Sequence, residues 1–98
     1  MPTNYARGAA AERRAKLELE GVGYLVVRAA GSKGPVDLIA LRAGQILLLQ
    51  IKTGAARISR QDRQTLAAIP RPSCALVQVW TRIRRGWLKE VITSDVMA

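Results

Sequence analysis

Hydrophobic and polar residues alternate at helical spacing near the start of the chain. Residues 7–20 are rich in Ala, Arg, Glu, Lys and Leu, which favour a helix, and Gly21 and Gly23 end it. At about 100° per residue, one face of this helix carries Gly8, Ala11, Glu12, Ala15, Leu19 and Val22. Glu12 is therefore a carboxylate on the face expected to meet the core, whereas Leu17 lies opposite and marks a candidate partner surface.

Short apolar runs separated by turn residues follow the helix, and this pattern predicts β-strands. The predicted strands are residues 24–29, 36–42, 45–52, 74–81 and 87–93. Residues 31–35 form a glycine-rich loop, and Arg82, Arg84, Arg85 and Gly86 form the last turn.

A second helix is predicted between the third and fourth strands. Ser59 is its candidate N-cap, with Asp62 three residues on, and it should end near Ile69 because Pro70 follows. The order α-β-β-β-α-β-β indicates an α/β fold, a central mixed five-stranded sheet flanked by helices, in one domain spanning residues 1–98.

The charge balance points to a polyanionic partner. Sixteen Lys and Arg residues oppose seven Asp and Glu residues, a formal net charge of +9. Such a charge opposes compaction unless a polyanion is near, and nucleic acid is the expected one. A basic surface without a partner, or one that binds acidic membranes, is the alternative. No apolar stretch spans a bilayer and no signal peptide is visible, so cytoplasmic residence (host cytoplasm for a phage protein) is expected.

The sequence has one cysteine, Cys74, and no histidine. An intrachain disulfide, a Cys/His zinc site and a Ser-His-Asp triad are thereby excluded. Cys74 stands in an apolar run and is expected in the core. Catalysis, if present, must use carboxylates, lysine, hydroxyls or a metal bound by oxygen.

The turn between the second and third strands sets the positions of four polar residues. Ala43 and Gly44 are too short a connection for anything but an antiparallel hairpin, which places Asp37 opposite Gln50. Lys52 projects from the same face as Gln50. Oxygen atoms gathered there suit Mg²⁺, with Mn²⁺ as a substitute, and Glu12 adds a carboxylate if the first helix packs beside the hairpin. This set fits metal-assisted phosphodiester hydrolysis, with Lys52 beside the attacking water or the developing charge.

Each of these residues also has a structural explanation. Asp37 would cap a strand, Gln50 and Lys52 would be solvated ends of an edge strand, and Glu12 would pair with Lys16. A bulge at Gly44 would shift the register by one residue and separate the group.

At these positions the sequence resembles the archaeal Holliday junction resolvases and their phage relatives. The resemblance is carried by residues 5–8, 11–13, 26–34, 36–38, 50–52 and 86–87. It implies a PD-(D/E)xK nuclease fold, a homodimer, and Mg²⁺-dependent cutting of paired strands in a four-way DNA junction, with no small-molecule cofactor and no membrane. By position, Glu12, Asp37 and Lys52 match the catalytic residues, Ser32 a loop serine near the scissile phosphate, and Arg7 a DNA-contacting residue.

The chain departs from that family at Gln50, where relatives usually have Glu, and in a shorter C-terminus. Gln50 is either a tolerated ligand or a change that weakens activity. Two other functions therefore stay open: a branched-DNA-binding protein with a degenerate nuclease site, and a nuclease for other branched or damaged DNA.

Basic residues near the predicted site are candidate phosphate contacts. Besides Arg7, they are Arg13, Arg28, Lys33, Arg57, Arg60 and Arg63. The last three cluster at the start of the second helix, whose N-terminal amides also favour anions. No base-reading helix is visible, so recognition by DNA shape and backbone is expected.

Overall fold

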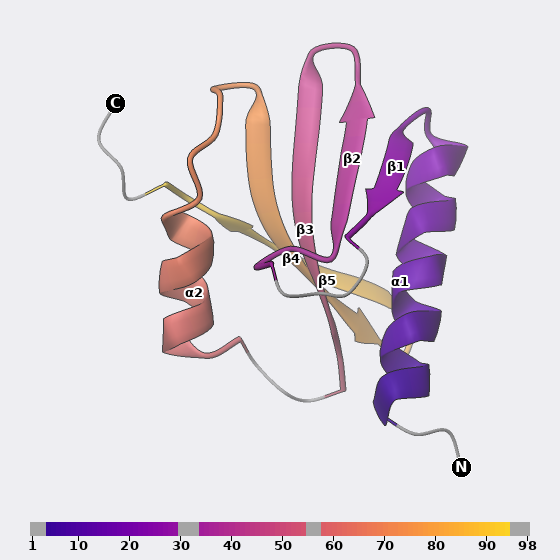
Figure 1. Ribbon diagram of the computed structural model, residues 1–98. Helices are drawn as coiled ribbons and strands as arrows, with labels where there is room; N and C mark the ends of the chain where they lie inside the picture. The colour runs from indigo at the N-terminus through magenta and orange to yellow at the C-terminus, as the bar shows by residue number, and fades with distance from the viewer. Residues whose placement is uncertain (1–3, 30–33, 55–57, 95–98) are drawn as a thin grey trace.

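The predicted order of helices and strands is confirmed by the computed structural model, which describes residues 4–29, 34–54 and 58–94 (Figure 1). The elements are α1 (Asn4–Gly21), β1 (Leu25–Arg28), β2 (Leu38–Arg42), β3 (Gln45–Thr53), α2 (Arg60–Ala67), β4 (Ala75–Ile83) and β5 (Gly86–Ile92). Ser59 caps α2, its hydroxyl accepting a hydrogen bond from the Asp62 amide at 3.0 Å.

The five strands form one mixed sheet in the order β1-β2-β3-β4-β5. Only β3 and β4 run parallel, because α2 provides the crossover that a parallel pair requires. Arg42 pairs with Gln45 across the predicted two-residue turn, and Gly44 takes a φ of 77°. The register continues without a slip to Leu38 opposite Leu49, as the sequence predicts.

The two helices cover opposite faces of the sheet. Ala15 and Leu19 of α1 pack in one core cluster with residues of β1 to β4, namely Val26, Leu38, Ala40, Leu47, Leu49 and Trp80. Leu66 of α2 is buried with Val77, Val79 and Ile92, and Leu48 packs against them. Since Leu48 alternates with Leu47 and Leu49 along β3, the clusters lie on opposite faces.

Three sequence predictions are wrong. Cys74 is exposed rather than in the core, because β4 begins one residue later and Cys74 belongs to the preceding turn. Val22 is 62% exposed, because α1 ends at Gly21 and no longer holds Val22 on its apolar stripe. Arg82 lies within β4, so the final turn is shorter than expected.

The exposed position of Leu17, opposite the buried stripe of α1, is confirmed: it is 63% exposed. None of the helices in the described part of the chain is long and apolar enough to cross a membrane.

Candidate active site

Asp37 lies where the β2 ladder ends, and three hydrogen bonds fix it. Its amide donates to the Leu49 carbonyl at 2.7 Å, and its carbonyl accepts from the Ala29 amide at 2.9 Å. Its carboxylate Oδ2 accepts from the Ile51 amide at 2.7 Å. The carboxylate therefore replaces a backbone acceptor at the end of the strand, and it is held against β3 by a charge-assisted bond.

Glu12 reaches the same end of the sheet from α1. Its side chain is only 22% exposed, and Oε1 lies 3.6 Å from Arg28 Nε of β1. Burial raises the pKa of Glu12, the negative charge of Asp37 raises it further, and Arg28 partly opposes both effects. The charge of Asp37 thus contributes to the raised pKa of Glu12, and Lys16 pairs with Glu20 instead of Glu12.

Gln50 contributes a buried amide oxygen to this region. Its Oε1 has no hydrogen-bond partner among the described residues. A buried acceptor without a donor destabilises the fold by roughly 1–3 kcal/mol, so a ligand that bonds to this oxygen would recover that free energy. An oxygen of this kind binds a hard cation without adding charge.

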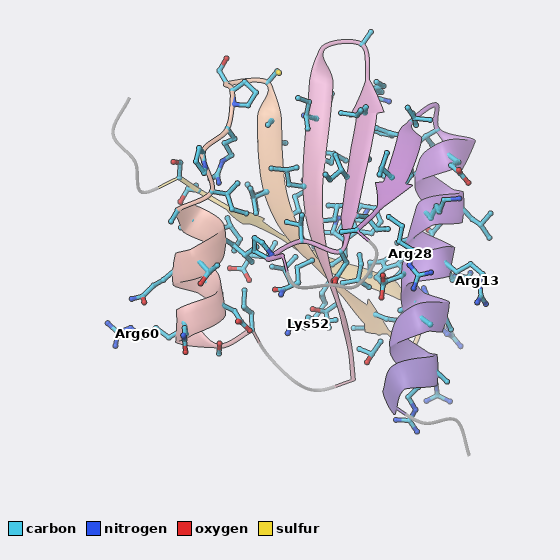
Figure 2. The ribbon with its side chains drawn as sticks, viewed as in Figure 1. Arg13, Arg28, Lys52 and Arg60 are labelled. Atoms are coloured by element: carbon cyan, nitrogen blue, oxygen red, sulfur yellow. The ribbon has the colours of Figure 1, made fainter. Side chains whose placement is uncertain are left out.

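Lys52 follows Gln50 on the same face of β3, which is also the face covered by α2. Its Nζ lies 3.7 Å from Asp62 Oδ2 of α2, and the Lys52 side chain is 29% exposed. Figure 2 shows Lys52 in the space between the two helices. The ammonium group is held near the site and open to solvent, so it is available to a phosphate.

A divalent cation fits this set of groups. Within the described residues, no cluster of three or more Cys, Asp and Glu side chains exists, so a carboxylate-only site is absent. The carboxylates of Glu12 and Asp37 and the unpartnered amide oxygen of Gln50 remain. A cation would relieve both the repulsion between Glu12 and Asp37 and the unmet acceptor.

The predicted DNA-binding residues fall into different environments. Arg13 and Arg60 point away from the sheet on the outer sides of α1 and α2, where DNA could reach them (Figure 2). Arg28 is 57% exposed even though it pairs with Glu12. Ser32, Lys33 and Arg57 lie outside the described residues.

Arg63 differs from these residues because a carboxylate already holds it. Nη1 and Nη2 donate to the two oxygens of Glu90 on β5, the second at 3.1 Å. The position predicted for DNA contact therefore forms a bidentate ion pair that connects α2 to the sheet.

Two basic residues were missed by the sequence analysis. Arg14 and Arg82 line a pocket together with Arg7. Arg82 faces Thr53 across the parallel β3–β4 pair. Continued alternation beyond residue 81 was the available signal, but the run of arginines there suggested a turn.

Comparisons with known proteins agree with the fold. The family model for archaeal Holliday junction resolvase (Hjc) matches residues 3–69, which include Glu12, Asp37, Gln50 and Lys52. The crossover junction endodeoxyribonuclease Hjc of Methanocaldococcus jannaschii is 42% identical over 69 residues, which are 67% of this chain and 51% of that protein. The chain thus spans about half the length of this curated relative.

The structural comparison covers more of the chain. The 1.6 Å resolution structure of Archaeoglobus fulgidus Hjc, a Holliday junction resolvase from an archaeal hyperthermophile, aligns with a TM-score of 0.74. The alignment covers 88% of this chain and 73% of that one at 22% identity, which shows the shared fold. Because the family model matches about two thirds of this chain, the chain belongs to the archaeal Holliday junction resolvase family.

Proposed function

We propose that this protein is a structure-selective endonuclease that resolves four-way DNA junctions by metal-dependent phosphodiester hydrolysis in the cytoplasm. One arrangement carries the proposal: the Ile51 amide holds the Asp37 carboxylate next to Gln50, whose Oε1 is buried without a partner among the described residues. The charge of Asp37 also raises the pKa of Glu12. The name of the Methanocaldococcus jannaschii relative, a crossover junction endodeoxyribonuclease, supports the same activity.

Three residues would hold the cation, which we infer to be Mg²⁺, with Mn²⁺ as a substitute. They are Glu12, Asp37 and Gln50. When bound there, a divalent ion lowers the pKa of a water molecule and neutralises charge on the scissile phosphate. The Ile51 amide keeps the Asp37 carboxylate in place before any ligand arrives, so less ordering is required on binding.

Lys52 would act on the phosphate itself. Its ammonium lies beside Asp62 at a distance longer than a hydrogen bond, so it can turn toward an incoming phosphate at small cost. There it stabilises negative charge that develops in the transition state, or orients the attacking water. Ser32, by its resemblance to the family's loop serine, would approach the same phosphate.

DNA would be held mainly by its backbone. A net charge of +9 favours phosphate contacts that release counterions. Arg13, Arg28 and Arg60 are exposed on three different elements around the site, which suits a surface that follows a branched duplex. Arg7, Lys33 and Arg57 extend this set in our proposal.

Paired incisions require two active sites, and we infer that they come from a homodimer. On the α2 side of the sheet, α2 packs over the β3–β5 half. The β1–β2 half carries Leu25 and Val27, which are 65% and 48% exposed, and the half-buried Ile39 and Leu41. An apolar patch of this kind is expected to be covered by a second copy of the chain.

The decisive experiment is cleavage of a synthetic four-way junction with Mg²⁺, compared with a linear duplex of the same sequence. Wild type should cut the junction at paired positions, and Asp37→Asn should not. Glu20→Gln is the matched control. It also removes one negative charge, but from the C-terminal end of α1, where Glu20 pairs with Lys16. An inert wild type that gains activity as Gln50→Glu would overturn catalysis by this chain and indicate a DNA-binding role.

The dimer is tested separately by light scattering. Val27→Lys should give monomers that bind DNA but no longer make paired cuts. Leu17→Lys, at an exposed apolar position on α1, should leave the dimer intact. The reverse result would move the interface to α1.

A further inference from the structure

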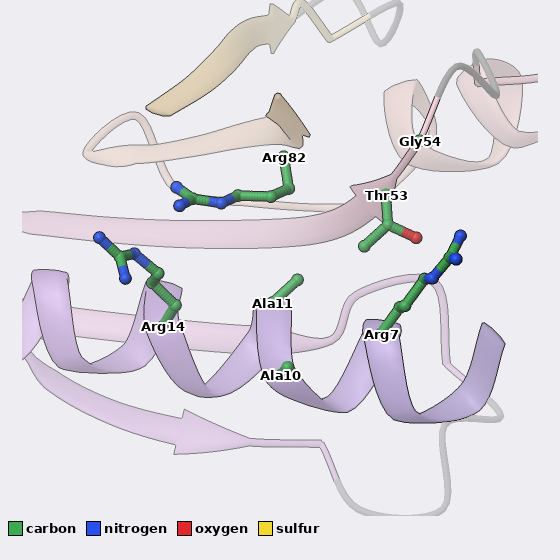
Figure 3. A pocket seen from close by; sticks show the side chains of 7 residues that line it. All are labelled: Arg7, Ala10, Ala11, Arg14, Thr53, Gly54 and Arg82. Carbon is green, nitrogen blue, oxygen red and sulfur yellow. The ribbon is translucent and has the colours of Figure 1, made fainter. Parts of the chain in front are cut away.

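A pocket of about 330 Å³ lies between the first half of α1 and the ends of β3 and β4 (Figure 3). Its lining consists of Arg7, Ala10, Ala11, Arg14, Thr53, Gly54 and Arg82. Three of these seven residues are arginines and none is acidic. Figure 3 shows Arg14 and Arg82 extending in the same direction from helix and strand, with Arg7 beside Thr53 at the other end.

Arg82 is held in place without a carboxylate among the described residues. Its Nη1 donates to the Gly86 carbonyl at 3.2 Å, and its guanidinium lies 5.1 Å from the centroid of the Trp87 ring. These contacts orient the group but leave its charge uncompensated. The remaining guanidinium hydrogens are free to bind a planar or tetrahedral anion in a forked geometry.

The other two arginines are also weakly compensated. Arg14 Nε lies 3.8 Å from Glu18 Oε2, and both side chains are about half exposed or more. Glu18 is engaged elsewhere as well, because it accepts a hydrogen bond from Trp87 Nε1 at 2.7 Å. No ion pair of Arg7 is found in the described part of the chain. Arg14 and Arg82 extend in the same direction, and like charges that lie near each other repel unless an anion joins them.

The floor of the pocket consists of small side chains. Ala10 and Ala11 lie one helical turn from Arg7 and Arg14, and Thr53 supplies a hydroxyl. Small residues leave room for a group of several atoms to approach the guanidiniums of Arg14 and Arg82.

The pocket is next to the proposed active site but separate from it. Ala11 precedes Glu12 on α1, and Thr53 follows Lys52 on β3, with side chains alternating between faces. A DNA strand at the carboxylates can therefore continue around the end of β3 into the pocket. Arg82 lies beyond residues 3–69, so the match to the family does not include it.

We propose that this pocket binds a backbone phosphate of the junction next to the scissile one, with Arg14 and Arg82 as its principal ligands. The inference rests on the proposed function, since it takes the phosphate to be part of the DNA substrate. The pocket fixes the register of the strand and has no role in bond breaking.

The test measures junction binding in EDTA by wild type, Arg82→Gln, Arg14→Gln and Arg84→Gln. The last is the matched control, because Arg84 is an exposed arginine in the adjacent turn. Loss of a pocket arginine should weaken binding about tenfold, as for a charge-assisted contact, and lower the slope of log K against log salt by about 0.9. Arg84→Gln should change both much less.

A second measurement separates a direct contact from a general loss of charge. One uncharged methylphosphonate is moved along the junction strand. When the methylphosphonate replaces the phosphate that the pocket binds, wild type and Arg84→Gln should lose affinity. Arg82→Gln and Arg14→Gln, which have already lost that contact, should lose nothing further. If Arg82→Gln fails to fold, the exposed Arg14→Gln decides the result. Equal penalties for all four proteins at every position would overturn the inference.

Inorganic phosphate distinguishes this failure from a failure of the proposed function. Phosphate should shift the Nε–Hε NMR signals of Arg14 and Arg82 and leave that of Arg84 unchanged. If these signals shift but the protein does not prefer a junction to a linear duplex, the phosphate pocket stands and the proposed function fails. Unmoved signals in a protein that binds junctions would overturn the pocket alone.

Discussion

Two regions meet at the end of β3, and they differ in how far their charged side chains are balanced by nearby groups. In the proposed active-site region each of these charged groups has a local partner: Glu12 has Arg28, Lys52 has Asp62, and Asp37 accepts from Ile51. In the arginine pocket no acidic residue contributes to the lining, and among its described residues Arg14 alone has an ion pair, with Glu18 outside the lining. Groups that perform chemistry must be held in position before substrate arrives, whereas groups that bind a polyanion gain most when the ligand supplies the missing charge.

The largest effect is expected from Asp37→Asn, which should separate the two regions functionally. Junction cleavage should fall by about three orders of magnitude, because a correctly held metal stabilises the transition state by several kcal/mol. Junction affinity in EDTA should stay within about twofold of wild type, since one lost repulsive charge is a small term. Quenched-flow cleavage and fluorescence anisotropy measure the two quantities. A parallel loss of both would show that the regions are not independent.

Gln50→Glu should sharpen the contrast by making the active-site region more acidic. A third carboxylate is expected to lower the Mg²⁺ concentration for half-maximal cleavage by about tenfold, because cation affinity depends on the number of charged ligands. The measurement is a Mg²⁺ titration of the cleavage rate. Gln50→Leu, which removes the oxygen at similar size, serves as the control and should require more Mg²⁺. An unchanged Mg²⁺ midpoint in both variants would remove Gln50 from the metal site.

Glu12→Gln tests the electrostatics of the metal-free site. The pKa of Glu12 is raised by burial and by Asp37, so folding favours its protonated form. Wild-type stability should therefore fall as pH rises from the ordinary pKa of 4.5 through the higher folded value. At neutral pH the variant should melt a few degrees higher in EDTA, and the two curves should converge in acid. A variant that melts lower at neutral pH would mean that the Arg28 contact outweighs burial and repulsion.

Glu90→Gln should have the smallest effect, because it changes a pair that is exposed at the surface. It leaves Arg63 without its ion-pair partner. The hydrogen bonds from Arg63 lower the pKa of Glu90, so the pair stabilises the fold above the ordinary pKa of the carboxyl group, and this contribution is lost as pH falls. The melting temperature at neutral pH should drop slightly, since both side chains are about half exposed. Junction binding should become slightly tighter. Weaker binding by this variant would place Glu90 in a structural role for DNA contact.

The hairpin shows why part of the site could be predicted from the sequence. A two-residue turn fixes the register, so Ala43 and Gly44 determine the pairs from Arg42–Gln45 to Leu38–Leu49 without any tertiary information. The ladder ends there, and the Asp37 amide bonds the Leu49 carbonyl, so the predicted pairing of Asp37 with Gln50 is not part of it. The α1 stripe likewise predicts that Glu12 faces inward. What could not be predicted depends on contacts between distant elements, such as the Arg63–Glu90 pair, and on where strands end, as for Cys74 and Arg82.

The hydrogen bond from Ile51 to Asp37 has a consequence for which ion the protein selects. Because Oδ2 already accepts a hydrogen bond from the main chain, more lone pairs remain for a cation on Oδ1 than on Oδ2. Calcium prefers many oxygens and often takes both from one carboxylate, whereas magnesium is smaller, demands octahedral geometry and accepts one oxygen per group. In our proposal, the hydrogen bond to Oδ2 would therefore favour Mg²⁺ over Ca²⁺ at Asp37.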